Sequence, residues 1–592
     1  MFKDPNQLDD FFGLSQDNHE KIIKSHNSPI KRRSLKETIL LIPQLLSRKE
    51  RYIILVLGIV IVGSIVSIPF VSFLHFTKAT QDYGGSFVEG IVGEPRYINP
   101  LLSRTSDVDR DLTTLVYSGL MKYNEEGKLI PDLIKSYEIS SDGLNYTVNL
   151  KDNVHWHDGV ELTADDVIFT IQIAQNSDYG SMERFNWQGV EMEKIDSYSL
   201  IFKLKNKYAQ FLNNFTIKIM PKHVWQDVKP INFAFSESNL KPIGSGPYKF
   251  SKLKKDQDGR VISYELQANK NYYDGRPYIN DITFQFYNSE DELIGGYNKN
   301  ELDSVGFISS KNLKKIKFKQ RLNIQQLTIP RYFAAFFNQN QSKLLSDKNI
   351  RLALSYATNK DTMVENILEG NGTVVNSPLG ADLFETNQDT QKVPYNLEQA
   401  KELLKSSGWD SIGDDGIRKK KDERLSLKIT TSSWPELVAV ANTLKEQWAQ
   451  LGVELNIEVA QTPDLQQIIK DRSYEILLFG EIMTPDPDPF SLWHSSQKRD
   501  PGLNLALYDN QKVDTLLEDA RKTLSPTERI KKYDDFQKAL AEDVPAIFLY
   551  NPYYLYPQTK QIHNFGMKVV GTPSDRFSNV NKWYIETKRT LK

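Results

Sequence analysis

One long apolar segment constrains this chain more than any other feature. From Tyr52 to Phe76 it runs for 25 residues without Asp, Glu, Lys or Arg. About 20 apolar residues span the core of a bilayer, so the segment is long enough to cross a membrane with some tilt. A buried core helix is the alternative, but core helices rarely stay free of charge over such a length. The segment therefore predicts a single transmembrane helix.

The charges before this segment predict its orientation. Residues 21–51 carry nine Lys or Arg against two Glu. The positive-inside rule then makes residues 1–51 a cytoplasmic tail and places everything after Phe76 outside the cell or in the periplasm, with residues 77–85 as a linker. A cleavable signal peptide is the alternative, because Thr77 and Ala79 form a weak small-residue cleavage site. A leader of this length would be unusual.

The overall composition excludes several classes of protein. Lys and Arg number 74 and Asp and Glu 76 among 592 residues, and this near balance gives no basic footprint for nucleic acid. The chain has no cysteine, which excludes disulfides, thiol nucleophiles, zinc–thiolate sites and cysteine-linked lipid anchors. The apolar helix is thus the membrane attachment that the sequence offers.

Residue patterns for catalysis or metal binding are missing. The chain contains no HExxH, GxSxG or GxxxxGK motif. His155, His157 and Asp158 resemble a metal site, but they stand beside an Asp-Gly turn, so we interpret them as a hairpin with solvated imidazoles. Asp486 and Asp488 are flanked by prolines and are interpreted as a solvated rim, or as a fortuitous calcium-like pair, rather than as a catalytic pair. We therefore predict no enzyme activity, no metal and no cofactor.

The part outside the membrane is predicted to be mixed α/β. Residues 144–150 alternate between apolar and polar and predict a half-buried strand. Further along, the pattern alternates between strand and helix: strand 425–429, helix 435–451, strand 453–459, helix from 464, strand 474–479. This order implies a largely parallel sheet with right-handed crossovers. Ligands bind beyond the carboxyl ends of such strands, which nominates the loops 430–434 and 480–489.

Each loop leaves two interpretations open. Trp434 begins a helix, where it either packs against the core or contacts a ligand. The loop 480–489, GEIMTPDPDP, is stiffened by three prolines and is either a rigid surface turn or the preformed rim of a cleft.

Seven motifs, in order along the chain, resemble those of one known family. The chain is similar to the extracellular solute-binding proteins of ABC importers, in the peptide/nickel-binding family (family 5) that includes oligopeptide- and dipeptide-binding proteins. The resemblance covers nearly all of residues 86–592 and rests on GEPRYINPLLS (93–103), LVYSGLMKYNEEGKLIPDL (115–133), NYTVNLKDNVHWHDGVELTADDVIFT (145–170), KPIGSGPYKF (241–250), FFNQNQSKLLSDKNIRLALSYATNKDTMVENIL (336–368), YNLEQAKELLKSSGW (395–409) and PAIFLYNP (545–552).

The resemblance implies a fold and a binding site. The fold would be a two-lobed, periplasmic-binding-protein-like (type II) α/β fold. Lobe I would comprise residues 86–330 and 548–592 with an inserted subdomain at about 121–240, and lobe II residues 331–547. Ligand would lie between the lobes, which close around it by a hinge motion. The implied ligand-binding residues are Arg104, Thr105, Ser106 and Asp107, which match a peptide-pairing strand edge, and Tyr117, Trp434, Glu481, Met483 and Asp486.

One departure from the family pattern concerns the ligand. Many peptide binders of the family hold the peptide amino group with an Asp, and that position falls on Met483 here. A buried ammonium needs a carboxylate partner, which Met cannot provide. Glu481 or Asp486 could substitute, or the solute has no free amine.

The leading hypothesis is a membrane-anchored receptor that captures a peptide or another small polar solute and passes it to an ABC transporter permease. The alternative is a ligand-sensing receptor or adhesion module built on the same fold.

Overall fold

The computed structural model describes residues 47–380 and 393–591. Most of the predicted cytoplasmic tail therefore lies outside the described residues. The chain forms two compact units. One runs to Thr80 and includes the C-terminal residues from Arg589, and the other is Gln81–Lys588.

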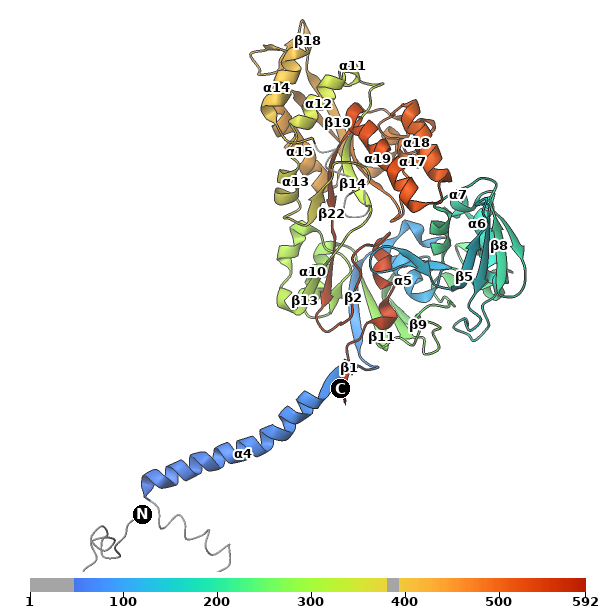
Figure 1. Cartoon of the computed structure of the whole chain (residues 1–592), viewed down its shortest axis with the longest axis vertical. Coiled ribbons are helices and arrows are strands. Elements are labelled where there is room, and N and C mark those ends of the chain that lie inside the picture. The colour runs from blue at the N-terminus through green and yellow to red at the C-terminus, as the bar shows by residue number, and fades with distance from the viewer. Residues whose placement is uncertain (1–46, 381–392, 592) are drawn as a thin grey trace, which may run out of the picture. The chain divides into compact units, whose positions relative to one another are not determined.

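Helix α4 (Arg48–Phe76) contains the apolar segment (Figure 1). Ser47 and Glu50 form a capping box, in which each side chain accepts a hydrogen bond from the other's backbone N–H. This cap explains why the helix begins four residues before the apolar run. Its large apolar side chains are exposed, Ile65 to 64% and Val66 to 69%. Among the described residues it is the one helix long and apolar enough to cross a membrane.

Part of the expected linker is a strand. Strand β1 (Thr77–Gln81) pairs with the last strand of the chain, β24 (Thr587–Leu591). Arg589 Nε donates to the Thr77 hydroxyl at 2.8 Å. The C-terminal strand therefore lies beside the residues that follow α4.

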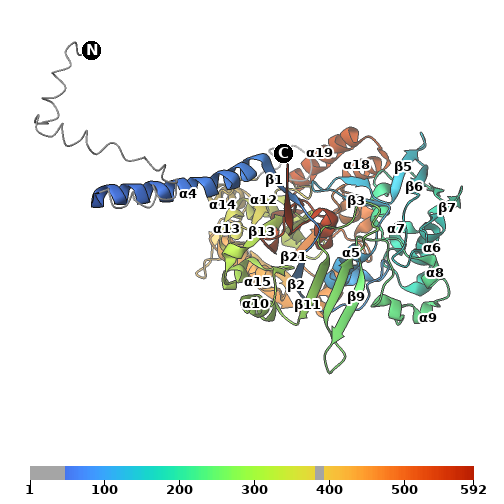
Figure 2. The same cartoon turned by 90° about the horizontal axis from the view of Figure 1, so that it is seen from below.

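Sheet I has the strand order β12-β2-β11-β10-β9. Strand β2 pairs in parallel with β11 and β12, and the β11-β10-β9 pairings are antiparallel. The strands are β2 (Ser86–Val92), β9 (Tyr248–Lys255), β10 (Val261–Ala268), β11 (Asp281–Tyr287) and β12 (Ser304–Val305). Helix α10 (Glu290–Asn298) contacts β2, and helix α5 (Asp107–Val116) contacts β9 (Figure 2).

Steric crowding explains why the Gly-Ser-Gly motif at 244–246 contains glycine. A Cβ on Gly244 would come 1.9 Å from the Val116 carbonyl oxygen at the end of α5. The Gly246 N–H donates to that same oxygen at 2.8 Å. Glycine is therefore needed where this segment crosses the helix end.

A second, smaller region is inserted in the sequence between strands β2 and β9 of sheet I. Its sheet has the order β5-β6-β8-β7 and is antiparallel throughout. The elements are β3 (Met121–Tyr123), β4 (Leu129–Pro131), β5 (Ile134–Ile139), β6 (Asn145–Leu150), α6 (Ala164–Gln175), β7 (Glu191–Lys194) and β8 (Ser199–Lys203). Strand β6 alternates between buried and half-buried residues, so the strand predicted at 144–150 is confirmed.

Sheet II has the order β15-β22-β14-β21-β19-β20. Strands β21, β19 and β20 are parallel and are connected by α15 and α16, so the predicted β-α-β-α-β unit is confirmed. The expectation of a largely parallel sheet is wrong, because β14, β15 and β22 pair antiparallel. The elements are β14 (Arg331–Phe337), β15 (Gly372–Val374), β19 (Ser426–Ser432), α15 (Pro435–Ala449), β20 (Glu454–Ala460), α16 (Thr462–Asp471), β21 (Ile476–Ile482) and β22 (Ala546–Pro552).

Helices cover both faces of sheet II (Figure 1). One core contains α12, α14 and α15, and the other contains α17, α18 and α19. The additional helices are α12 (Lys348–Tyr356), α14 (Leu397–Ser406), α17 (Phe490–Trp493), α18 (Gln511–Lys522) and α19 (Pro526–Asp543).

Two antiparallel strands connect the sheets. Strand β13 (Leu322–Leu327) leads into β14, and β23 (Tyr554–Thr559) follows β22, and the two pair with each other. The chain therefore passes between the sheets at residues 328–330 and again at Tyr553. The expected lobe boundary at residue 548 falls inside β22, which pairs with β14 through a run of buried residues. Strand β22 itself ends at Pro552.

Candidate functional site

A cavity of about 110 Å³ lies where the chain passes between the sheets. It is lined by Thr328, Pro330, Arg331, Thr373, Val374, Val375, Pro378, Gly380, Met483 and Asn551. These residues come from the crossing before β14 and the start of that strand, from β15 and the segment that follows it, from the end of β22, and from the loop after β21. The site therefore combines a strand-to-strand crossing with one of the two loops that the sequence nominated.

Arg331 is the charged residue in this lining. Its Nη2 donates to the Pro552 carbonyl at 2.8 Å, and its Nε has no hydrogen-bond partner among the described residues. Burial lowers the pKa of Arg331, and the carboxylate of Glu436 partly opposes that effect. Asn551 donates to the Ile329 carbonyl at 2.9 Å, whereas its own Oδ1 is buried without a described partner. The cavity thus offers one unused donor and one unused acceptor.

An aromatic group adjoins Arg331. The Phe333 ring stacks on Tyr550 at 5.2 Å and lies 5.7 Å from Trp434. The Tyr550 hydroxyl donates to Glu436 Oε1 at 3.0 Å, and burial raises the pKa of Glu436. Trp434 precedes α15 and remains 42% exposed, so its ring both packs on Phe333 and presents a free face.

Met483 and Glu481 both adjoin the core on the α17–α19 side, and Met483 in addition lines the cavity. Met483 lines the cavity, and its backbone N–H donates to the Pro330 carbonyl at 2.7 Å. Glu481 lies in the core on the α17–α19 side and accepts a hydrogen bond from the Tyr332 hydroxyl. Burial raises the pKa of Glu481 to about 8. Glu481 therefore does not present an ionised carboxylate to a ligand, contrary to the substitution considered from the sequence.

The carboxylates of the proline-rich loop are also engaged. Asp486 pairs with Arg529 through two contacts of 2.9 and 3.1 Å. Asp488 pairs with Arg521, with contacts between 2.6 and 3.0 Å. Asp486 and Asp488 are thus ion-paired with arginines of α19 and α18, but the Asp486 side chain remains 38% exposed, so the expected solvated rim holds only in part. An amine would have to share Asp486 with Arg529.

The same loop contacts the inserted region. Gln210 Nε2 donates to the Pro487 carbonyl at 2.9 Å, and the Tyr208 hydroxyl donates to Asp488 at 3.2 Å. Asn213 Nδ2 reaches the Asp486 carbonyl at 3.1 Å and the Thr484 hydroxyl at 3.3 Å. The loop is therefore more than a free surface turn, since it joins the sheet II region to the insert.

Residues 104–107 form a turn and a helix start. Arg104 and Thr105 belong to the 3-10 helix Ser103–Thr105, and Asp107 is the first residue of α5. The Ser106 hydroxyl caps α5 by accepting from Asp109 N–H at 3.3 Å. Arg104 pairs with Glu183 of the insert at 3.4 Å. The strand edge expected here is therefore replaced by a helix cap, and none of these residues lines the cavity.

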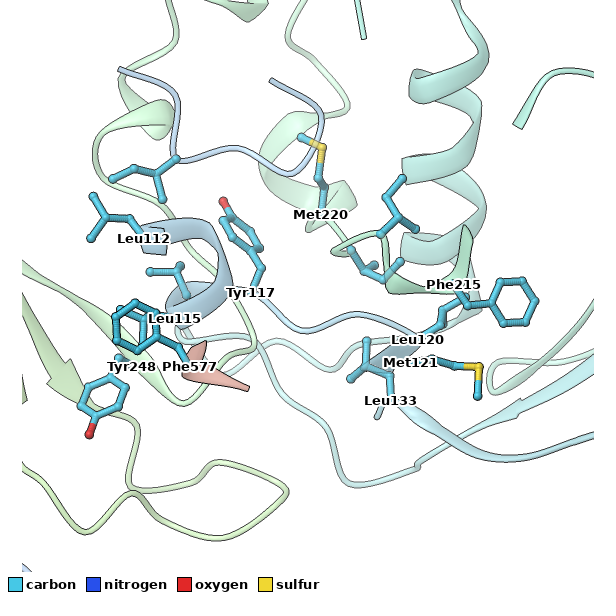
Figure 3. Close-up of a cluster of buried hydrophobic side chains, with 14 of the residues drawn as sticks. Leu112, Leu115, Tyr117, Leu120, Met121, Leu133, Phe215, Met220, Tyr248 and Phe577 are labelled. Atoms are coloured by element: carbon cyan, nitrogen blue, oxygen red, sulfur yellow. The ribbon is translucent and has the colours of Figure 1, made fainter. Parts of the chain in front are cut away.

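Tyr117 is a core residue. It is 1% exposed and ends α5 beside Leu112 and Met220 (Figure 3). Burial raises the pKa of Tyr117, and its hydroxyl has no described hydrogen-bond partner. It does not line the cavity described above.

The histidine pair forms no metal site. Among the described residues no cluster of three or more potential metal-ligating side chains occurs. His157 is held between Gly244 N–H and the Gly246 carbonyl, at 3.2 and 3.1 Å, and burial lowers its pKa to about 4. The prediction of a solvated imidazole is wrong for His157, because it packs under the Gly-Ser-Gly segment.

The sequence analysis missed Arg331, Asn551 and Glu436. A weak signal existed for Glu436, which follows the nominated Trp434 and Pro435. Arg331 and Asn551 lie at ends of strands far apart in sequence, and only the pairing of β14 with β22 brings them together.

Comparison with known proteins extends this picture. The chain is similar to the oligopeptide-binding protein AppA of Bacillus subtilis, with 29% identity over 512 residues, covering 85% of this chain and 92% of AppA. The structure of AppA in complex with a nonapeptide matches with a TM-score of 0.67 at 28% identity, covering 86% of this chain and all of that chain. NikZ of Campylobacter jejuni in complex with Ni(L-His) matches with a TM-score of 0.69 at 29% identity, over 84% of this chain and 99% of NikZ.

The substrate-binding protein CtaP of Listeria monocytogenes gives a TM-score of 0.72 at 28% identity, over 85% of this chain and all of CtaP. These likenesses confirm the expected periplasmic-binding-protein fold. The model of the bacterial extracellular solute-binding proteins, family 5, matches residues 128–502. With that match over more than half of its length, the chain belongs to the family 5 extracellular solute-binding proteins, which bind solutes for ABC transporters and are not enzymes.

Proposed function

We propose that this protein is a membrane-anchored receptor that captures a peptide between two lobes and delivers it to an ABC permease. The observation that carries the proposal is the cavity at the strand crossing, where Arg331 and Asn551 present unused polar atoms beside an exposed Trp434. A small number of convergent polar groups in an otherwise apolar pocket is typical of ligand sites. The nonapeptide bound by AppA supports a peptide as the solute.

The two lobes follow the sheets in this proposal. Lobe I contains sheet I, the insert and the return segment after Pro552, and lobe II contains sheet II. The crossings at residues 328–330 and Tyr553 are the hinge, because few residues there need to change their backbone angles for the lobes to separate. The contacts of Asn213 and Gln210 with the loop 484–489 hold the lobes together on one side.

The anchor is the second component of the proposal. A helix with exposed apolar side chains and no Asp, Glu, Lys or Arg over residues 52–76, preceded by a basic segment, supports permanent insertion with the N-terminus in the cytoplasm. Tethering raises the effective concentration of the receptor near the permease. N-terminal sequencing of the protein isolated from membranes tests this point. A mature chain that begins near Thr80 would show that the helix is a signal sequence.

Transport is tested by the uptake of a labelled peptide pool into cells that lack the gene, with and without the full chain restored. We expect uptake to depend on the chain. Unchanged uptake together with an altered signalling or adhesion phenotype would favour the alternative function instead. Mass spectrometry of solutes that co-purify with the full chain would identify the natural ligand.

Lobe opening can be tested separately, because the chain has no native cysteine. The double variant Asn213→Cys and Thr484→Cys, joined by a short thiol-reactive cross-linker, links the lobes where those side chains now lie 3.3 Å apart. Cross-linking should block uptake, whereas Asn213→Cys alone should remain active after the same treatment. Full uptake by the linked protein would contradict the hinge.

A further inference from the structure

Arg331 is the charged side chain among the described residues that line the cavity at the strand crossing. The described lining residues include no Asp or Glu. No carboxylate of the described residues forms an ion pair with Arg331, whose hydrogen bond to the protein goes to the Pro552 carbonyl. A guanidinium presents five N–H donors in a fork that matches a carboxylate. Most of these donors are unused here, and Nε is buried.

Glu436 is the neighbouring carboxylate to consider. Its Oε1 accepts the Tyr550 hydroxyl at 3.0 Å, and it attracts Arg331 without pairing with it. Glu436 therefore offsets part of the charge of Arg331 but leaves the donors of the guanidinium free. Burial lowers the pKa of Arg331, as expected for a cation that lacks a close counter-ion. An anion entering the cavity would remove this penalty.

The remaining lining indicates what accompanies the anion. Asn551 Oδ1 is a buried acceptor without a described partner, so it needs an N–H from a ligand. Met483, Val374 and Val375 supply apolar surface. A volume of about 110 Å³ is small beside pockets for whole drug-sized ligands, which measure about 300–1,000 Å³. The cavity thus suits one end or one side chain of a ligand.

We infer that Arg331 binds a carboxylate of the solute, while the Asn551 carbonyl accepts an N–H from the same ligand. The subsite rests on the proposed function and specifies the class of solute, a peptide bound through a carboxylate. Two sources share this chemistry, the C-terminal carboxylate and an acidic side chain. The Met483 side chain then contacts the apolar part of the ligand rather than an ammonium group.

Four synthetic hexapeptide pools of randomised sequence test the inference with the full chain in detergent. They have a free or an amidated C-terminus, each with or without Asp and Glu, and binding is followed by the shift of the melting temperature and by tryptophan fluorescence. We expect the amidated pool without acidic residues to bind about 10- to 100-fold more weakly than the free acidic pool, as for one charge-assisted hydrogen-bonded pair. The two intermediate pools identify which carboxylate is bound.

Arg331→Gln should remove the preference between pools, and Arg331→Lys should retain part of it. Arg499→Gln is the matched control, because it removes an exposed arginine that does not line the cavity, so the preference should remain. If wild type binds all four pools equally, or if Arg331→Gln keeps the preference, the inference is wrong although the proposed function stands. If no pool binds to wild type, both are wrong. If Arg331→Gln does not fold, the test compares the preference of wild type among the four pools with that of Arg331→Lys.

Discussion

Replacing Arg576 with methionine tests how much stability a buried ion-pair cluster beside sheet I provides. The Arg576 side chain is fully buried, and it pairs with Glu89 at 2.7 Å and with both oxygens of Asp111 at 2.6 and 2.8 Å. The Tyr556 hydroxyl donates to the second oxygen of Glu89 at 2.7 Å. The cluster therefore connects β2, α5 and β23 with the 3-10 helix Pro573–Phe577, which contains Arg576.

Methionine keeps most of the volume of arginine but leaves two buried carboxylates without a cation. Removing one partner of a buried ion pair typically costs about 3–5 kcal/mol. Burial raises the pKa of both Glu89 and Asp111 even with Arg576 present. In Arg576→Met these values rise further, so the carboxyls of the folded variant bind protons that the unfolded chain has already released.

The variant should consequently lose stability as the pH rises. The slope approaches about 1.4 kcal/mol per pH unit for each carboxyl that is protonated only in the folded state. Urea unfolding of the full chain in detergent, at several pH values between 5 and 8, measures this. We expect a loss of about 3–5 kcal/mol at pH 7.5 that becomes smaller at pH 5.

Arg418→Met is the matched control. Arg418 is 8% exposed and donates to the backbone carbonyls of Leu451 and Trp409, at 2.8 and 2.6 Å. Its loss leaves unpaired carbonyls but no described ion pair broken, so the destabilisation should not depend on pH. A loss below about 1 kcal/mol for Arg576→Met, or one that is the same at pH 5 and pH 7.5, would refute the reasoning.

Three further predictions use single substitutions in the full chain. Glu481→Gln should raise the melting temperature relative to wild type above pH 5, by an amount that grows up to pH 8. The pKa of Glu481 is about 8 in the folded protein, so wild type loses stability as the pH rises from the pKa of the unfolded chain towards 8. An equal difference between variant and wild type at pH 5 and pH 8 would contradict this. His157→Gln should reduce the loss of stability that wild type shows in acid. The pKa of His157 is lowered to about 4 in the folded protein, so wild type loses stability as the pH falls from about 6.5 to 4. A variant that still follows the wild-type pH profile over that range would speak against a buried neutral imidazole. Gly244→Ala should lower the melting temperature markedly, because its Cβ would lie 1.9 Å from the Val116 carbonyl oxygen, whereas Gly259→Ala at an open turn tests the cost of the left-handed backbone alone; similar losses in both would exclude the clash as the cause.

Much of the architecture can be predicted from local pattern. The alternation in residues 453–459 and the apolar run in 474–479 predict β20 and β21, and the charge-free run predicts α4, because each pattern depends on the period of one element. The glycine motif at 244–246 could be recognised as a family feature, but its steric cause requires the end of α5, which lies more than a hundred residues earlier.

The candidate site was harder to predict, and β21 shows why. Sheet II is covered by helices on both faces, so β21 is largely apolar and its sequence does not distinguish one face from the other. Glu481 pairs with Tyr332, and the next residue, Ile482, pairs with Arg331. Successive side chains of a strand point to opposite faces. Glu481 therefore enters the core, while Ile482 is 64% exposed.

The sequence by itself determined the long apolar helix, the order of strands and helices in sheet II, and the family, because these depend on composition and on short periodic patterns. The tertiary structure alone decided which charges are available to a ligand. Arginines from α18 and α19 pair with Asp488 and Asp486, the core takes up Glu481, and the pairing of β14 with β22 brings Arg331 to Asn551. Whether a charge is free depends on partners that lie far away in the chain, and a local pattern does not contain that information.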